Sequence, residues 1–225
     1  MTRHSAPGPR RSLLRDTSAV SMIEFALSLP FLFALCVAGL ELSNMAMAYM
    51  RVSNIAVKTA DHVARVRTAI DEADINEIFV GSKLMGQKID FANHGRIIVS
   101  SIEPLMNNAS PPQIANQYLR WQRCTGADPA NSSHGNEGDG ATGTAQAAGY
   151  GLPGQPKIVA AQNTAVILAE VVYQYQPLIL PAWFGPITIH TSQSMPVRER
   201  NDQAIRNGQN LTNAQKSLCT NPHTA

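Results

Sequence analysis

The hydrophobic pattern begins with a continuous apolar run and then becomes periodic. Residues 18–42 are apolar except for a few small polar side chains and two acids, Glu24 near the start and Glu41 at the end. A bilayer core of about 30 Å needs roughly 20 helical residues, so residues 21–42 are long enough to cross it. From Leu42 to Ile70 the apolar residues recur at steps of three and four. This pattern predicts one helix over residues 18–69, first apolar and then amphipathic, although two helices broken near the membrane surface would show the same periodicity.

After this helix the pattern predicts a shorter helix and then strands. Apolar residues continue at helical spacing to Met85, and Gly86 follows. Runs rich in β-branched and aromatic residues, bounded by Pro or Gly, predict strands over residues 96–102, 118–123, 165–175 and 187–194. Alternation in residues 170–175 favours a sheet with one face on a helix and the other in water. The expected fold class is α+β, a long transmembrane-to-amphipathic helix packed on a small antiparallel sheet.

A glycine-rich stretch interrupts the predicted strands. Residues 126–154 contain eight glycines among Ser, Asn, Asp and Ala, with almost no large apolar side chain. This composition predicts a flexible insert, residues 126–156, that adds almost nothing to a core. Residues 138–143 and 149–154 also match the G-x-G-x-x-G spacing of dinucleotide-binding loops. Both matches lack the strand before and the helix after that the fingerprint requires, so we reject a nucleotide site.

Charge sets the expected topology. Four arginines precede the span, against Arg51 and Lys58 after it, and the positive-inside rule then places the amino terminus in the cytoplasm. The predicted segments are a basic leader (1–19), a transmembrane helix (20–42), an amphipathic helical segment (43–90) and a periplasmic α+β domain (91–225) at a bacterial inner membrane. A removable signal peptide fits poorly because the apolar run exceeds 7 to 15 residues and contains an acid. The net charge of +2 is spread along the chain, which argues against nucleic acid.

Cysteines and histidines provide the remaining candidate chemistry. Cys36 lies in the span, whereas Cys124 and Cys219 both fall in the predicted periplasmic domain. An even pair in an oxidising compartment predicts a disulfide, the alternative being two unpaired thiols. The six histidines are scattered, without HExxH or Cys-x-x-Cys spacing for zinc and without a G-x-S-x-G nucleophile motif. We therefore expect neither an enzyme nor a cofactor or metal. Between the last two strands, the loop carrying Trp183 and Phe184 is the predicted docking surface.

Glu24 is the most informative residue. A carboxylate at mid-bilayer costs roughly 2.5 to 3.5 kcal/mol and less near the interface, so an intramembrane acid calls for a partner. A new terminal amine at Val20, made by cleavage after Ala19, would supply it, as in the signals of type IV prepilins. The small residues of the span could let helices approach closely, although they also fit ordinary membrane-helix composition; they are Ala26, Ser28, Ala34, Ala38 and Gly39.

The segment resembles the amino terminus of the TadE-like family of pilus-assembly pseudopilins, from tight-adherence or Flp-type systems. The matching features are the arginines at 10, 11 and 15, the small residues 18 and 19, the sequence Glu24-Phe25-Ala26, Pro30 and Glu41. That family usually has glycine where this chain has Ala19. The resemblance implies a non-enzymatic pilus-assembly component whose partners are a prepilin peptidase, the Flp-type major pilin, a sibling pseudopilin and the inner-membrane assembly platform. The alternative is a single-pass periplasmic binding or interaction domain unrelated to pili.

Overall fold

A computed structural model of the chain describes residues 17–151, 153–179, 185–200 and 202–221. The chain divides into two compact units, residues 1–44 and 45–225. The first helix, α1 (Thr17–Arg65), belongs to both units. This confirms the single long helix expected from the sequence, although it ends at Arg65 and not at residue 69. Pro30 lies inside α1, a position that transmembrane helices tolerate more readily than soluble ones.

Short elements lead from α1 into the sheet. The two-residue strand β1 (Ile70–Asp71) precedes α2 (Glu72–Met85). Asp71 begins α2 with a capping box: its carboxylate accepts from Ala73 N at 3.0 Å, and Asp74 accepts from Asp71 N at 3.0 Å. A 3₁₀ turn (Gln87–Ile89) and α3 (Phe91–His94) follow. Phe91 packs against Gly86 so closely that a Cβ there would lie 2.4 Å from the Phe91 side chain, which explains why glycine ends α2.

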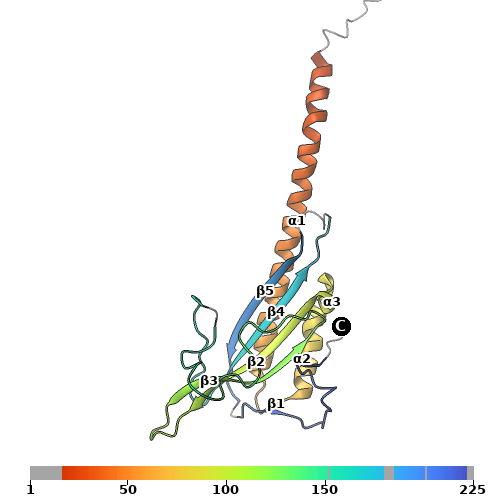
Figure 1. Cartoon of the computed structure of the whole chain (residues 1–225). Coiled ribbons are helices and arrows are strands. Elements are labelled where there is room, and N and C mark those ends of the chain that lie inside the picture. Colours follow the sequence, from red (N-terminus) through yellow and green to blue (C-terminus); the bar gives the residue numbers. More distant parts are fainter. Residues whose placement is uncertain (1–16, 152, 180–184, 201, 222–225) are drawn as a thin grey trace, which may run out of the picture. The chain divides into compact units, whose positions relative to one another are not determined.

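Four antiparallel strands form the main sheet, in the order β3-β2-β4-β5. They are β2 (Gly95–Met106), β3 (Ile114–Thr125), β4 (Val166–Tyr175) and β5 (Ile187–Pro196). Each predicted strand is present, and β2, β3 and β5 extend beyond the predicted ranges. A separate parallel pair joins β1 to β6 (Ile205–Arg206). Figure 1 shows the four strands side by side, with helices along one face.

The main core lies between the helices and this face of the sheet. The part of α1 after Met45 buries Val52, Ile55 and Val63, and α2 contributes Ile75 and Phe79. The sheet supplies the opposing side chains, among them Ile97, Val99, Trp121, Ile167, Val171 and Tyr173. This confirms the predicted α+β arrangement, in which a long apolar helix packs on an antiparallel sheet. Removing apolar area from water contributes about 25 cal/mol of free energy per Å². This is the main stabilising contribution from such an interface.

Most of the opposite face of the sheet is also covered, which corrects two expectations from the sequence. A second cluster contains Ile102, Leu119, Leu168, Ala160 and Tyr150. Tyr150 belongs to the glycine-rich insert, is 2% exposed, and donates from its hydroxyl to Asp139 O at 2.6 Å. The expectation that the outer face meets water is therefore wrong for β4, where Glu170 and Val172 are buried, although Thr188, His190, Ser192 and Ser194 of β5 are exposed on that face. The expectation that the insert adds almost nothing to the core is also wrong, because Tyr150 is buried. The insert covers the sheet with one buried aromatic ring and many backbone contacts, so its sequence needs no apolar pattern.

A bulge in β3 allows this strand to place side chains in both hydrophobic clusters. Ser101 pairs with Trp121 and Ile102 pairs with Leu119, so Arg120 is the extra residue. Without a bulge, Leu119 and Trp121 would point to the same face. The bulge turns Trp121 toward the helices and Leu119 toward the insert.

Candidate functional site

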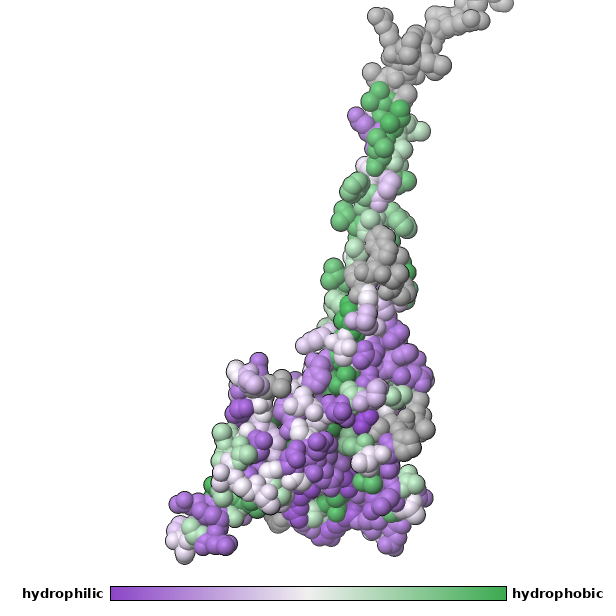
Figure 2. Space-filling view, viewed as in Figure 1, coloured by the Kyte–Doolittle hydropathy of each residue, from purple (hydrophilic) through white to green (hydrophobic). Residues whose placement is uncertain are grey.

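The first part of α1 presents apolar side chains on its exposed surface. Residues from Val20 to Leu42 are largely exposed, including Phe25 at 61%, Phe31 at 78% and Leu42 at 58%. Figure 2 shows this apolar surface along the helix. Among the described residues, α1 is the one helix long and apolar enough to cross a membrane. Exposed apolar surface of this extent is costly in water and requires lipid or other apolar helices.

Two serine hydroxyls of α1 are hydrogen-bonded within the helix. Ser28 Oγ donates to Phe25 O at 2.9 Å, and Ser43 Oγ donates to Gly39 O at 2.8 Å. Both hydroxyls are thereby satisfied within the helix, as lipid requires. A Cβ built on Gly39 would meet nothing within 4 Å, so this position leaves a flat place on the helix surface. Such places allow close helix–helix approach in membranes.

The residues predicted for processing lie at the start of α1. Ala19 and Val20 are within the helix, and Glu24 is exposed one turn further on. Residues four apart share a helix face, so the Glu24 carboxylate and the backbone at Val20 lie on the same side. The rise between them is about 6 Å at 1.5 Å per residue.

In the second unit, Cys124 of β3 and Cys219 of the carboxyl tail form a disulfide with a Cα–Cα distance of 4.8 Å. This is the pairing expected from the sequence, and it indicates an extracytoplasmic domain because such bonds persist in oxidising compartments. The tail also pairs with β3 through Cys124 N donating to Ser217 O at 2.8 Å and through a bridge between Arg123 and Leu218. Arg96 donates to Cys219 O at 3.2 Å.

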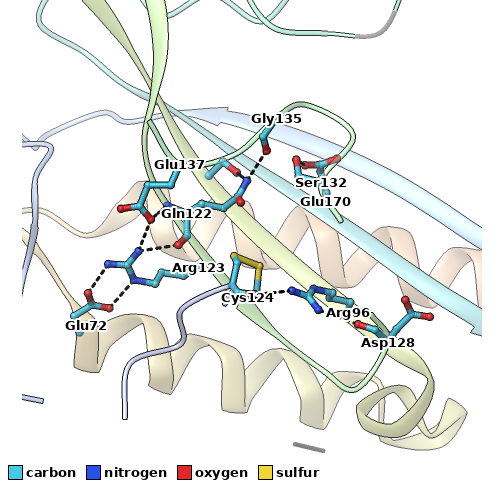
Figure 3. Close-up of a disulfide and its surroundings, with 12 residues drawn as sticks. Glu72, Arg96, Gln122, Arg123, Cys124, Asp128, Ser132, Gly135, Glu137 and Glu170 are labelled. Atoms are coloured by element: carbon cyan, nitrogen blue, oxygen red, sulfur yellow. Dashed lines mark hydrogen bonds and ion pairs between the residues drawn. A yellow bond between two sulfur atoms is a disulfide. The ribbon is translucent and has the colours of Figure 1, made fainter. Parts of the chain in front are cut away.

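Next to the disulfide, a buried arginine joins three parts of the domain (Figure 3). Arg123 of β3 makes a bidentate pair with Glu72 of α2, at 2.8 Å and 2.6 Å. It also contacts Glu137 of the insert at 3.0 Å. Burial alone would lower the pKa of Arg123, but Glu72 and Glu137 hold it above its usual value. Because the ion pair is bidentate, it holds α2 against β3 in a defined orientation.

A second polar cluster surrounds Glu170 of β4, which is fully buried. The insert supplies its partners: Ser132 Oγ donates to Oε2, Ser133 Oγ and N lie 2.6 Å and 2.9 Å from Oε1, and His134 Nδ1 lies 2.9 Å from Oε1. His190 Nε2 of β5 is 3.9 Å from the same oxygen. Burial alone would raise the pKa of Glu170, but His134 and the two serine hydroxyls outweigh it and lower the pKa to about 2.

This cluster contains the residue types of a hydrolytic triad without its geometry. Ser133 Oγ lies 3.1 Å from His134 Nδ1, the same ring nitrogen that faces Glu170. A catalytic histidine instead contacts its nucleophile and its orienting acid through different nitrogens. The His134 side chain is only 5% exposed and Glu170 is closed off, so the arrangement holds the insert against β4. No three metal-ligating side chains gather within the described part of the chain.

The sequence did not indicate this cluster. Glu170 is separated from its insert partners by more than thirty residues, and the insert reads as polar loop. Glu199 is not part of this cluster and contacts Arg67 at 3.0 Å. The His190 side chain, at the edge of the cluster, is 39% exposed. Trp183 and Phe184, predicted as a docking surface, fall outside the described residues.

Together, the exposed apolar helix, the α+β domain and the disulfide define a pilin-like arrangement with one candidate membrane anchor among the described residues. The family model described as TadE-like protein matches residues 19–61, so this segment is TadE-like. The match confirms the resemblance noted in the sequence and covers α1 without the sheet. No curated protein and no solved structure matches the chain.

Proposed function

We propose that this protein is a membrane-anchored, non-enzymatic pseudopilin of an Flp-type (type IVc) pilus-assembly system. The observation that carries the proposal is the exposed apolar helix with Glu24 near its start, in the segment that matches the TadE-like model. TadE-like proteins belong to pilus machinery and are generally not enzymes. The amino terminus lies in the cytoplasm and the disulfide-bonded domain in the periplasm.

Processing and assembly follow from the position of Glu24. A prepilin peptidase cuts after Ala19, so Val20 becomes the first residue and carries a positive amine. The Glu24 carboxylate, one helical turn away, requires a positive partner in an apolar environment. Pairing with the amine of a neighbouring subunit sets the register of the two helices. The flat surface around Gly39 and the small residues near it then permits close packing of the helices.

The partners are those of the assembly machinery: the prepilin peptidase, the Flp-type major pilin, a sibling pseudopilin and the inner-membrane assembly platform. The soluble domain acts as a spacer and docking surface. The disulfide and the Arg123–Glu72 pair support this role because they hold the sheet, α2 and the tail together as one rigid unit.

Amino-terminal sequencing of the membrane-extracted protein tests the processing. We expect a chain starting at Val20. In the variant Glu24→Gln cleavage should continue, whereas co-purification with the Flp-type pilin should fall at least about tenfold, equivalent to about 1.4 kcal/mol of pairing free energy. Ser28→Ala is the matched control, because its hydroxyl bonds only within the helix and its loss leaves the intermolecular charge pair unchanged.

Recovery of an intact Met1, or of a cut beyond Cys36, would refute the processed form. Undiminished pilin association of Glu24→Gln would refute the charge pairing. If both fail and no pilus component co-purifies, the anchored periplasmic binding or interaction domain replaces the pseudopilin.

A further inference from the structure

The helix α2 presents an apolar strip to solvent. Ile75 and Phe79 of this helix are buried in the main core, whereas Val80, Leu84 and Met85 are exposed, the first two by more than half. Residues three or four apart share a helix face, so Val80 and Leu84 lie together on the side away from the core. Apolar side chains grouped on the surface of a folded domain indicate an interaction site.

Gly81 lies in the middle of this strip. A Cβ built on it would meet nothing within 4 Å, so the packing of this chain does not require a glycine there. Glycine inside a helix is less stable than alanine, and its presence at an exposed position therefore favours contact with another molecule. The missing side chain leaves a shallow place beside Leu84, which can receive a side chain of another helix.

An acid and a base lie at the two ends of the strip. Glu77 precedes Gly81 by one turn of α2, and Lys88 follows Leu84 by about one turn, in the 3₁₀ turn after α2. Both residues are exposed, and neither side chain has an ion-pair partner among the described residues. The positions 77, 81, 84 and 88 are separated by four, three and four residues, which is the spacing of the contact positions in a coiled coil.

We propose that α2 pairs antiparallel with α2 of a second copy of this chain, about a two-fold axis that passes between positions 82 and 83. Each Glu77 then faces Lys88 of the other copy. Each Leu84 enters the shallow place beside Gly81 of the other copy, and Val80 borders the contact. The apolar strip is covered and both charges gain partners.

Symmetry favours a second copy over a different protein. A two-fold contact requires a surface that is complementary to itself. This strip has that property, because reversing its direction exchanges Glu77 with Lys88 and Gly81 with Leu84. A parallel pair would instead place like charges together, which coiled-coil pairing avoids.

The contact is small, which determines where it can form. The helix α2 is about 21 Å long, so the pair buries less than the roughly 800 Å² per partner of a standard interface. Two copies confined to one membrane have a high effective concentration, which compensates for weak contacts. This inference therefore requires membrane anchorage, but it requires neither cleavage after Ala19 nor a pilus.

Crosslinking of the full-length protein in membranes of its host tests the register. Two differently tagged copies are co-expressed, each with Cys36→Ser so that the introduced cysteine is the only free thiol. When one copy carries Glu77→Cys and the other Lys88→Cys, a short bismaleimide should join them. Two copies that both carry Glu77→Cys should give no crosslink, because antiparallel pairing places these positions about 16 Å apart along the helices.

Exchanging the charges tests recognition, with a crosslink between the Val80→Cys positions of two copies as the reporter. Glu77→Lys should lower the crosslinked fraction at least about threefold, because two ion pairs become like-charge contacts. Lys88→Glu should have the same effect, and the double variant Glu77→Lys/Lys88→Glu should restore the original fraction. Lys58→Glu, at an exposed position of α1, is the control and should leave the fraction unchanged.

The variant Gly81→Gln separates association from folding. Glutamine has a higher helix propensity than glycine, and a Cβ at this position meets nothing in the chain, so the domain should be at least as stable. The place for Leu84 of the other copy is filled, however, so the crosslinked fraction should fall. Glu77 lies beside His62 and Arg65 in a shallow depression, and pulse proteolysis therefore verifies the folding of each variant.

Several results would overturn the proposal. A crosslink between two copies of Glu77→Cys would show a parallel pair, and a crosslink from Val80→Cys to another protein would show a different partner. The proposal would also be wrong if the double variant did not restore crosslinking, if Gly81→Gln left the fraction unchanged, or if no crosslink formed.

Discussion

Replacing Glu170 by glutamine should lower the free energy of unfolding near pH 7 by about 3 kcal/mol. The carboxylate is fully buried, and the His134 ring and two serine hydroxyls from the insert contact it. These contacts lower its pKa from the ordinary 4.5 to about 2. At about 1.36 kcal/mol per pKa unit, that difference corresponds to about 3 kcal/mol. Glutamine preserves the shape but removes the charge.

The pH dependence has a definite sign. Because the folded-state pKa lies below the unfolded value, the charge stabilises the native protein fully above about pH 4.5, and this contribution is lost as the pH falls toward 2. The difference in stability between wild type and Glu170→Gln should therefore be about 3 kcal/mol near pH 7 and close to zero near pH 2.

Urea titration of the detergent-solubilised full-length chain measures this difference. The fluorescence of the buried Trp121 reports unfolding, with Trp183→Phe introduced into every protein so that one tryptophan remains. Glu77→Gln, at an exposed position of α2, is the matched control and should change stability by less than about 0.5 kcal/mol. Equal destabilisation near pH 7 and near pH 2 would show that the loss arises from packing, and no loss near pH 7 would refute the electrostatic argument.

Two further predictions concern the covering of the sheet. Cys219→Ser should destabilise the domain by about 4 to 5 kcal/mol in the chain-entropy model for a loop of 95 residues. Wild type in reductant should show the same loss of stability. Free alkylation of Cys124 and Cys219 in native protein would disprove the bond. Deleting residues 126–154 should destabilise the fold by at least about 3 to 5 kcal/mol, the cost of losing a buried aromatic such as Tyr150, measured by pulse proteolysis. Shortening only the exposed residues 142–147 is the control, and equal stability of the two deletions would contradict a structural role for the insert.

The order and type of the main elements can be predicted from the pattern of apolar and polar residues. Periodicity of three and four from Leu42 to Ile70 depends only on which residues face a core, so α1 could be read without knowing its partners. Dense β-branched runs similarly located β2, β4 and β5. The disulfide followed from compartment and parity, because Cys124 and Cys219 were the two cysteines outside the span.

The covering of the outer face of β2, β3 and β4 depends on contacts between residues far apart in the chain, so it could not be predicted from the sequence. The polar residues around Ser133 have the composition of a loop. Their partner Glu170 lies far away in the sequence, so no local pattern could predict the contact. The glycines of the insert indicated flexibility, but several permit close backbone approach. Gly140 has φ +81°, and a Cβ there would lie 2.2 Å from Gln117 O; Gly126 likewise approaches Gly95 O. Composition cannot distinguish a glycine that loosens a loop from one that lets it pack, because the difference lies in the atoms of another strand.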